Sequence, residues 1–299
     1  MPETDDVRAQ IARLGRRSAE ARRRAASAEA SAARFEERAA PPSTSASLRQ
    51  ACLRAAAMQR GVQARHLASA RLQDQYADHL RTWLERAGGA ERQPVLVDAV
   101  AAAIGMQSAA VVLLGARRGE GVVAGSDATA RAAYDLEFVL GEGPVRLAVA
   151  DGRAVRAAGT AVYGRWPQYG PAVARLGVHA VVAVPLQPPA GLGAVCGYDS
   201  QPAISQQAAA AAGQVAAALP LILSQAEGGS PPGDGVHGPP LFGEADVPAV
   251  VHQAAGMVSQ QCGCEIGDAL ALLRARAFSA GRPAGEIAAE VVHGGLRLG

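Results

Sequence analysis

Residues 7–39 place apolar or small side chains at alternating spacings of four and three, and this heptad pattern constrains the fold more than any other feature. A repeat about four heptads long predicts a helix whose seam packs against another helix, as in a coiled coil. Because Ala buries far less area than Leu, this pairing is weak. We expect residues 1–40 to form a helix that contributes to a homodimer without holding it together alone. The seam consists of Val7, Ile11, Leu14, Ser18, Ala21, Ala25, Ala28, Ala32, Phe35 and Ala39.

The helical region continues over residues 41–92 after a break. The sequence PPSTSAS at 41–47 stops the first helix and supplies N-cap residues for a second, which we expect from about Leu48 to Ala87. One stripe on this second helix indicates packing against a partner helix or the next domain. The stripe consists of Leu72, Tyr76, Leu80 and Trp83.

Charge is unevenly distributed along the chain. Residues 1–92 carry 17 Arg against 11 acidic residues, a net charge of +6, whereas residues 227–299 carry four Arg against eight acidic residues, or −4. All 29 basic residues are arginine, which indicates a GC-rich coding bias. Arginine content alone is therefore poor evidence for nucleic-acid binding. An arginine-rich RNA-binding arm at the N-terminus is the alternative interpretation.

Residues 93–226 alternate between strand and helix patterns. Two pairs of segments have the pattern of antiparallel strands joined by turns, 109–115 with 121–127 and 178–186 with 191–199. Strands paired in this way and flanked by helices indicate an α+β domain with an antiparallel sheet. The helices predicted to flank the strands lie at 95–105, 128–138 and 205–225.

A Gly- and Pro-rich linker at 227–243 precedes residues 244–299, where the pattern predicts three short helices. Gly281 stops the second helix and Pro283 opens the third. Phe278 is the only aromatic residue within the three helices, and we expect it in their core. The inward-facing positions predicted by periodicity are Val247, Val251, Ala254, Val258, Ile266, Leu270, Leu273, Ala277, Ile287, Val291 and Val292.

Several classes of protein find no support in the sequence. The N-terminus lacks the apolar segment of a signal peptide, and no stretch approaches the roughly 18 apolar residues of a membrane span. We therefore expect a cytoplasmic protein with free thiols. Cys262 and Cys264 are too closely spaced for a structural zinc site, and no P-loop, HExxH or GxSxG motif occurs. His66 and His79 lie on a predicted helix, but no kinase signature follows, so we expect no enzyme.

Residues 125–186 contain motifs that resemble those of the GAF domains of actinobacterial regulators. The motifs are the LGEGP loop and GRAV segment within 125–157, and RWP, LGV and a strand ending in PL within 163–186. The resemblance covers about residues 95–226. It implies a pocket between the sheet and the helices and loops of 128–170, where a small molecule or partner would be sensed. The candidate lining residues are Glu142, Tyr163, Trp166 and Tyr169. No motif indicates haem, bilin or a cyclic nucleotide, so the cofactor is unknown.

Residues 251–292 resemble the ANTAR domain through QAAGM, EIGDAL, LLRARAF and GRPAGEIAAEVV. This family forms a three-helix module that binds paired RNA stem-loops and relieves transcription termination. Many members carry Lys where Ala255 stands here. The RNA-binding residues implied by the resemblance and by charge are Ala254, Ala255, Gly256, Arg274, Arg276 and Arg282.

Together these features predict a signal-responsive antitermination regulator, in which a homodimer presents two RNA-binding modules at once. Small Ala254 and Gly256 either admit a backbone close to the helix or let helices pack. The missing lysine and the acidic C-terminal region favour the alternative, a protein-interaction adaptor without RNA binding, because phosphate neutralisation supplies much of the affinity for nucleic acid.

Overall fold

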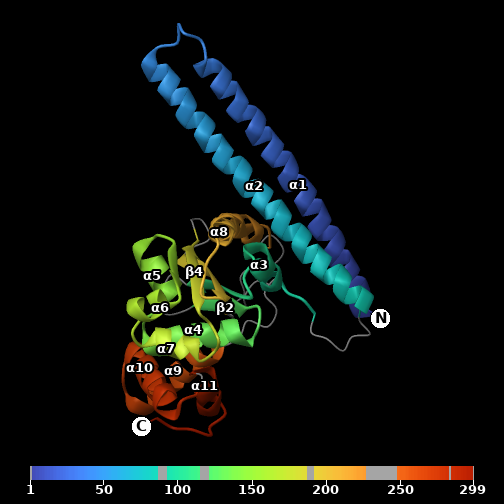
Figure 1. Ribbon diagram of the computed structural model, residues 1–299. Helices are drawn as coiled ribbons and strands as arrows, with labels where there is room; N and C mark the ends of the chain where they lie inside the picture. The colour runs from blue at the N-terminus through green and yellow to red at the C-terminus, as the bar shows by residue number, and fades with distance from the viewer. Residues whose placement is uncertain are drawn as a thin grey trace. The chain divides into compact units, whose positions relative to one another are not determined.

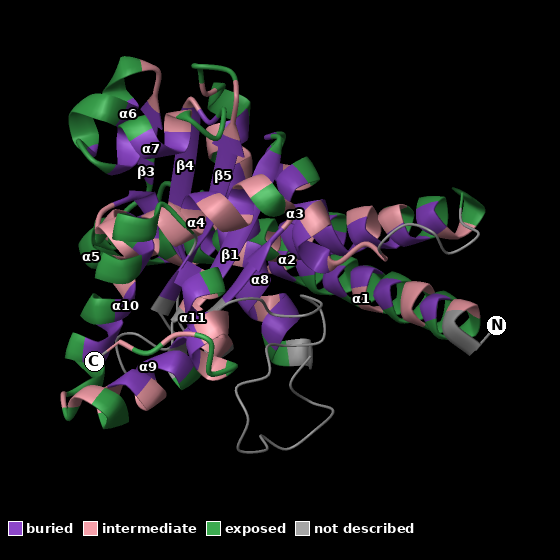
Figure 2. Cartoon of the chain, turned by 90° about the horizontal axis from the view of Figure 1, so that it is seen from below, coloured by how far each residue is buried: buried purple, intermediate pink, exposed green. Residues whose placement is uncertain are grey.

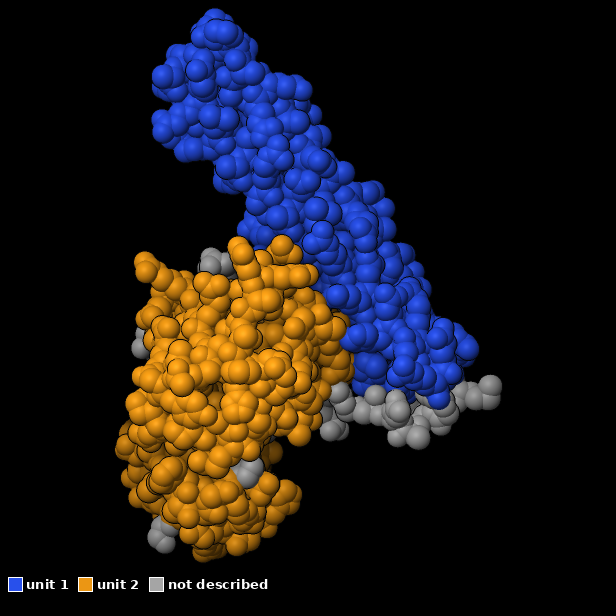
Figure 3. All heavy atoms as spheres, in the orientation of Figure 1, with its two compact units in different colours: residues 1–94, 217–222 blue, residues 95–216, 223–299 orange. Residues whose placement is uncertain are grey.

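The computed structural model describes residues 2–86, 93–114, 121–186, 192–226, 248–282 and 284–298. They form two compact units, coloured separately in Figure 3: residues 1–94 with 217–222, and residues 95–216 with 223–299. The predicted linker at 227–243, Val247 and Pro283 lie outside the described residues.

In the first unit, α1 (Pro2–Ala39) and α2 (Ala46–Arg86) form a helical hairpin (Figure 1). The helices are antiparallel, because Gln10 near the start of α1 donates to the hydroxyl of Tyr76 at 2.9 Å. Near the other end of α1, Glu36 pairs with Arg60 at 2.8 Å. Between these contacts, Ser18 donates to the carbonyl of Ala70 at 3.4 Å.

The heptad seam is buried within this hairpin. The seam residues of α1 are at most 5% exposed, apart from the half-buried Ile11 and Phe35. The predicted stripe of α2, from Leu72 to Trp83, is buried as well. The prediction of paired helices is therefore confirmed, but the partner helix comes from the same chain. A homodimer would need a surface other than this seam.

The second unit contains a five-stranded sheet in the order β2-β1-β5-β4-β3, with every neighbouring pair antiparallel. The predicted pairing of 109–115 with 121–127 is confirmed by β1 and β2, and that of 178–186 with 191–199 by β4 and β5. The mixed helix and antiparallel-sheet class is thus confirmed. The strands are β1 (Ser108–Leu114), β2 (Gly121–Gly125), β3 (Val155–Ala158), β4 (Ala180–Pro185) and β5 (Leu192–Asp199).

Helices cover both faces of the sheet. On one face, alternate strand residues such as Val112, Val181 and Cys196 share a core with four helices that follow β2 and β3. On the other, α3 (Leu96–Ile104) ends so close to the sheet that a Cβ on Gly197 would lie 2.6 Å from the sulfur of Met106. The strands are therefore buried along most of their length (purple in Figure 2). The four helices of the first face are α4 (Ala128–Leu140), α5 (Pro144–Asp151), α6 (Thr160–Arg165) and α7 (Tyr169–Ala174).

Helix α8 (Gln206–Ala226) is 21 residues long and contains no charged residue. Its stretch Gln206–Ser224 is long and apolar enough to cross a membrane, which the sequence analysis did not anticipate, and 50% of it is buried within the structure. The core helix of a soluble protein meets the same criteria of length and composition. The stretch is therefore weak evidence for a membrane span.

The C-terminal module consists of α9 (Pro248–Cys262), α10 (Ile266–Ala280) and α11 (Ala284–Val292), in agreement with the three predicted helices. Gly281 ends α10 in the left-handed conformation with φ 61°, which glycine adopts without strain. The fully buried core of the module contains only Ala, Val, Leu and Ile. Ile266 departs from the predicted inward face and is 56% exposed, because it is the first residue of its helix.

Candidate functional site

Glu137 is a buried carboxyl group that joins α4 to the start of α5. Its oxygens accept hydrogen bonds from the backbone N–H groups of Val145 at 3.1 Å and Arg146 at 2.5 Å. Burial raises its pKa to about 7, although both hydrogen bonds favour the charged form. A Cβ on Gly143 would lie 2.5 Å from Cγ of Glu137. The absence of a side chain at Gly143 therefore leaves room for this carboxyl group to reach the N-terminus of α5.

Glu142, a predicted ligand-binding residue, already accepts hydrogen bonds from the protein backbone. Its Oε1 accepts hydrogen bonds from the backbone N–H groups of Gln168 at 2.6 Å and Tyr169 at 2.8 Å, at the start of α7. Such a carboxylate satisfies N–H groups that have no partner within the helix. Glu142 thus fixes the position of α7 in this structure, with its side chain half-buried.

The three predicted aromatic lining residues separate into two groups. Trp166 and Tyr169 are buried and pack edge to face, with ring centroids 5.9 Å apart. Tyr163 is 40% exposed and lies outside this core. The structure therefore brings two of the three rings together, and of these only Tyr169 carries a polar atom without a hydrogen-bond partner.

A cluster of buried polar groups lies in the core between the sheet and helices α4 to α7; we call Glu137, Tyr169, Cys196 and Tyr198 the buried polar cluster. The hydroxyl group of Tyr169 is buried and has no hydrogen-bond partner among the described residues, whereas the buried hydroxyl group of Tyr198 interacts with the Cys196 thiol. Burial raises the pKa of both tyrosines and of the Cys196 thiol, and the nearby Glu137 raises each further. Unpartnered buried hydroxyl groups are costly unless a ligand or water pairs with them. The cluster can therefore offer hydrogen bonds to a small polar ligand.

Sequence reasoning missed two of the four residues of this cluster. Cys196 is a core thiol, as predicted, but Tyr198 and Glu137 were not singled out. A signal for Tyr198 exists, because Ala194, Cys196 and Tyr198 alternate along β5 and all face the core. For Glu137 no such signal exists, since a carboxyl group on an amphipathic helix is normally exposed.

In the C-terminal module, the predicted RNA contacts Ala254 and Ala255 are fully buried. Their side chains pack in the module core, and a direct contact with RNA does not follow from this geometry. Gly256 is half-buried, and a Cβ there would meet nothing within 4 Å. The small side chains of Ala254 and Ala255 therefore allow the helices to pack closely. Helix packing does not require glycine at position 256, because a Cβ there would meet no neighbouring atom.

The three predicted arginines have different environments. Arg276 is exposed on α10. Arg282 pairs with Glu286 at 3.1 Å and with Glu290 at 2.8 Å, so its charge is already neutralised within the module. Arg274 is half-buried, and its guanidinium lies over a ring of α4.

The prediction that Phe278 lies in the core is wrong. Its side chain is 67% exposed, because it stands outside the buried face of α10 formed by Leu270, Leu273 and Ala277. Leu272 on the same helix is 42% exposed. An exposed aromatic ring and an exposed arginine thus share α10, next to a core of small aliphatic side chains.

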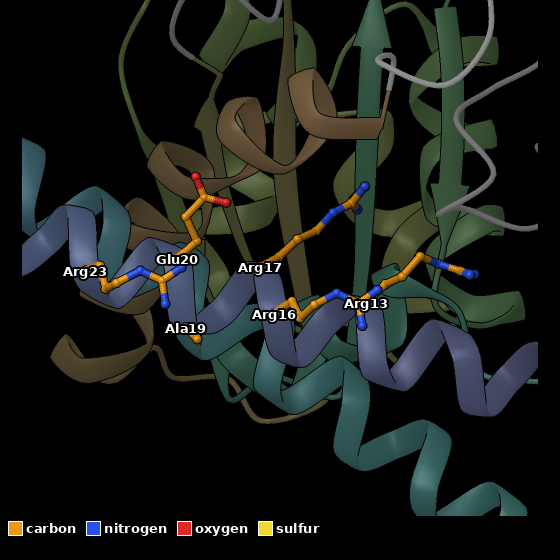
Figure 4. A pocket seen from close by; sticks show the side chains of 6 residues that line it. All are labelled: Arg13, Arg16, Arg17, Ala19, Glu20 and Arg23. Carbon is orange, nitrogen blue, oxygen red and sulfur yellow. The ribbon is translucent and has the colours of Figure 1, made fainter.

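An arginine-lined hollow of about 460 Å³ lies on α1 (Figure 4). Four of its six lining residues are arginines, with one acidic side chain, Glu20, among them. This concentration of charge attracts anions.

Among the described residues, no group of three or more His, Cys, Asp or Glu side chains could hold a metal ion.

Comparisons with known proteins name no family for this chain. No protein-family model matches it, and no curated protein matches it. Among solved structures, it is similar to a domain of a protein described as a two-component sensor histidine kinase from Sinorhizobium meliloti 1021, with 16% sequence identity and a TM-score of 0.32. The match covers 44% of this chain and 88% of that domain. At this TM-score the similarity says nothing about function.

Proposed function

We propose that this protein is a signal-responsive RNA-binding regulator of transcription antitermination, with a GAF-type sheet domain as sensor and an ANTAR-type C-terminal module as the RNA-binding part. The observation that carries the proposal is the exposure of Phe278 and Arg276 on α10. Bases in RNA loops are recognised by stacking on aromatic side chains and by contacts from arginine. A small module with its aromatic ring on the surface is suited to this task.

The sensing role is supported by the buried polar cluster. Tyr169 places a hydroxyl group in the sheet-domain core without a hydrogen-bond partner among the described residues, near the Tyr198 hydroxyl and Cys196 thiol groups. A small polar ligand that paired with these groups would remove the cost of leaving them unsatisfied. Binding there would stabilise one arrangement of α4 to α7, because these helices share that core.

Paired RNA stem-loops need two modules, and we propose that two copies of the chain provide them. Linking two modules raises avidity without any new contact. The heptad seam is not available for this pairing, since α2 covers it within one chain. The dimer would use a different surface.

An adaptor that binds protein in place of RNA is the second candidate. Arg282 is neutralised by two carboxylates, and Ile266, Leu272 and Phe278 expose apolar surface on α10. Large apolar side chains exposed on one helix favour a protein partner. In this case RNA would not displace the protein partner from α10.

The test is the affinity of full-length protein for an RNA with two stem-loops, compared with one stem-loop and with a plain duplex of equal length. We expect the tightest binding to the paired stem-loops, measured by fluorescence anisotropy. Equal, weak binding to all three RNAs, or none, would overturn the proposal and leave the adaptor.

A further inference from the structure

Arg274 contacts a helix of the sheet domain in place of solvent. Its guanidinium carbon lies 4.4 Å from the ring centroid of Phe138 on α4. Its Nε is buried and has no hydrogen-bond partner in the described part of the chain. Phe138 and Val139 also pack against the hydrophobic core of the C-terminal module, and α4 contacts both α10 and α11. The face of the guanidinium that a stacking ligand would use is therefore covered by the sheet domain.

The surroundings of Arg274 differ from those of a structural arginine. A buried cation is normally paired with a carboxylate, because desolvation of its charge is costly. The exposed Arg282 pairs with Glu286 and Glu290, whereas among the described residues no carboxylate pairs with the half-buried Arg274. Burial lowers its pKa, and the neighbouring positive charge of Arg146 lowers it further. An unpaired guanidinium on an aromatic ring, with a second positive charge acting on it, thus forms a position that suits a flat ligand with negative charge.

Phe278 extends this position along α10. Residues four apart on a helix are neighbours on one face, so Phe278 lies one turn beyond Arg274 on the same side. Its ring is 67% exposed, whereas Arg274 is covered by Phe138. On this side of α10 the phenyl ring of Phe278 is therefore accessible to a ligand, whereas the guanidinium of Arg274 is covered by Phe138.

We propose that Arg274 and Phe278 form a stacking site for an unpaired base of an RNA loop, and that Phe138 holds the place of such a base in this structure. The inference rests on the proposed RNA-binding function and deepens it. A loop base stacks on arginine and aromatic planes, and its phosphate carries the charge that Arg274 and Arg146 attract. The sheet domain and RNA thus compete for one guanidinium face, so release of the module from α4 would favour RNA binding.

The test uses full-length protein and the RNA with two stem-loops. Phe138→Leu keeps most of the apolar volume but removes the ring face, and we expect it to tighten RNA binding by about two- to thirtyfold, the range of a cation–π contact. Leu140→Ala is the matched control, because Leu140 lies on the same helix and packs against the sheet-domain core. Leu140→Ala should leave the affinity unchanged.

Two further variants separate the roles of the residues. Arg274→Gln should weaken RNA binding, and Phe138→Leu added to it should give no gain. Phe278→Ala should also weaken binding. An Arg274→Gln variant with undiminished affinity would overturn the site even where Phe138→Leu failed to fold.

A second readout reports on the contact without RNA. Phenylglyoxal should react with Arg274 faster in Phe138→Leu than in the protein without substitutions, as located by peptide mass mapping. Bound RNA should slow this reaction. RNA binding that is equal in the unmodified sequence, Phe138→Leu and Leu140→Ala would overturn the inference while the RNA-binding function stands. Absence of RNA binding in every variant would overturn the proposed function, and this inference with it.

Discussion

The sheet domain and the C-terminal module differ in what their cores bury. The core of the sheet domain contains Trp166, Tyr169 and Tyr198, with the carboxyl group of Glu137 also fully buried. The core of the module consists of Ala, Val, Leu and Ile alone, and its one aromatic ring, that of Phe278, stands on the surface. Groups inside a core are reached only by a small ligand, whereas groups on a surface are reached by a macromolecule. This contrast suits a sensor in one region and a binding surface in the other.

The largest effect is expected where the aliphatic core is disrupted. Leu273→Ala removes a fully buried side chain and should destabilise the module by about 2–5 kcal/mol. Leu272→Ala is the matched control, because the neighbouring side chain is 42% exposed. Amide hydrogen exchange over α9 to α11 measures both. Equal losses of protection in the two variants would contradict the assignment of the core.

The next effect concerns the buried carboxyl group. Burial raises the pKa of Glu137 from 4.5 to about 7 in the folded protein. Stability from this group is therefore fully present below about pH 4.5 and is lost as pH rises through about 7. The free energy of unfolding should fall by up to about 1.4 kcal/mol per pH unit in that window.

Glu137→Gln should remove this pH dependence, while Glu142→Gln should keep it. Urea denaturation followed by the fluorescence of Trp166, in a Trp83→Phe background, measures the sheet domain alone. A pH dependence that survives in Glu137→Gln would assign it to another group.

A smaller effect is expected at the buried hydroxyl groups. Tyr169→Phe removes a buried hydroxyl group that has no hydrogen-bond partner among the described residues, so stability should stay equal or rise by up to about 1 kcal/mol. The same denaturation assay measures the change, and Tyr198→Phe should be less favourable, because the Tyr198 hydroxyl group interacts with the Cys196 thiol. A clear loss of stability in Tyr169→Phe would mean that a water molecule or ligand pairs with the hydroxyl group.

The smallest effect is expected for Arg282, whose side chain forms ion pairs on the surface of the module. Arg282→Ala should change the melting temperature little, and less still at high salt, because exposed ion pairs are screened. Differential scanning calorimetry at two salt concentrations is sufficient. A large drop would indicate that these pairs hold α11 in place.

Local signals predicted much of this fold. The β1–β2 and β4–β5 pairs follow from alternation around short turns, and the ends of α10 follow from Gly281 and the periodic stripe. The pairing of β1 with β5 joins Ser108 to Tyr198, which no local pattern indicates. The heptad pattern predicted a paired helix but carried no information on which chain supplies the partner.

The functional residues were harder to predict. Phe278 was expected in the core as the only aromatic residue of the three helices, and this expectation was wrong because it lies outside the buried stripe of α10. The contact of Arg274 with Phe138 depends on how the module packs on α4. Such a contact between segments more than 130 residues apart has no signature in either segment.

The central claim is that α10 docks RNA through its exposed cation and ring. The most direct measurement is the affinity of full-length protein for RNA with two stem-loops over a series of salt concentrations, with Arg276→Ala and Arg282→Ala beside the unmodified sequence. The account predicts affinity that falls with salt, and a slope reduced by about one in Arg276→Ala but unchanged in Arg282→Ala. A slope that is the same in Arg276→Ala, or affinity independent of salt, would contradict it.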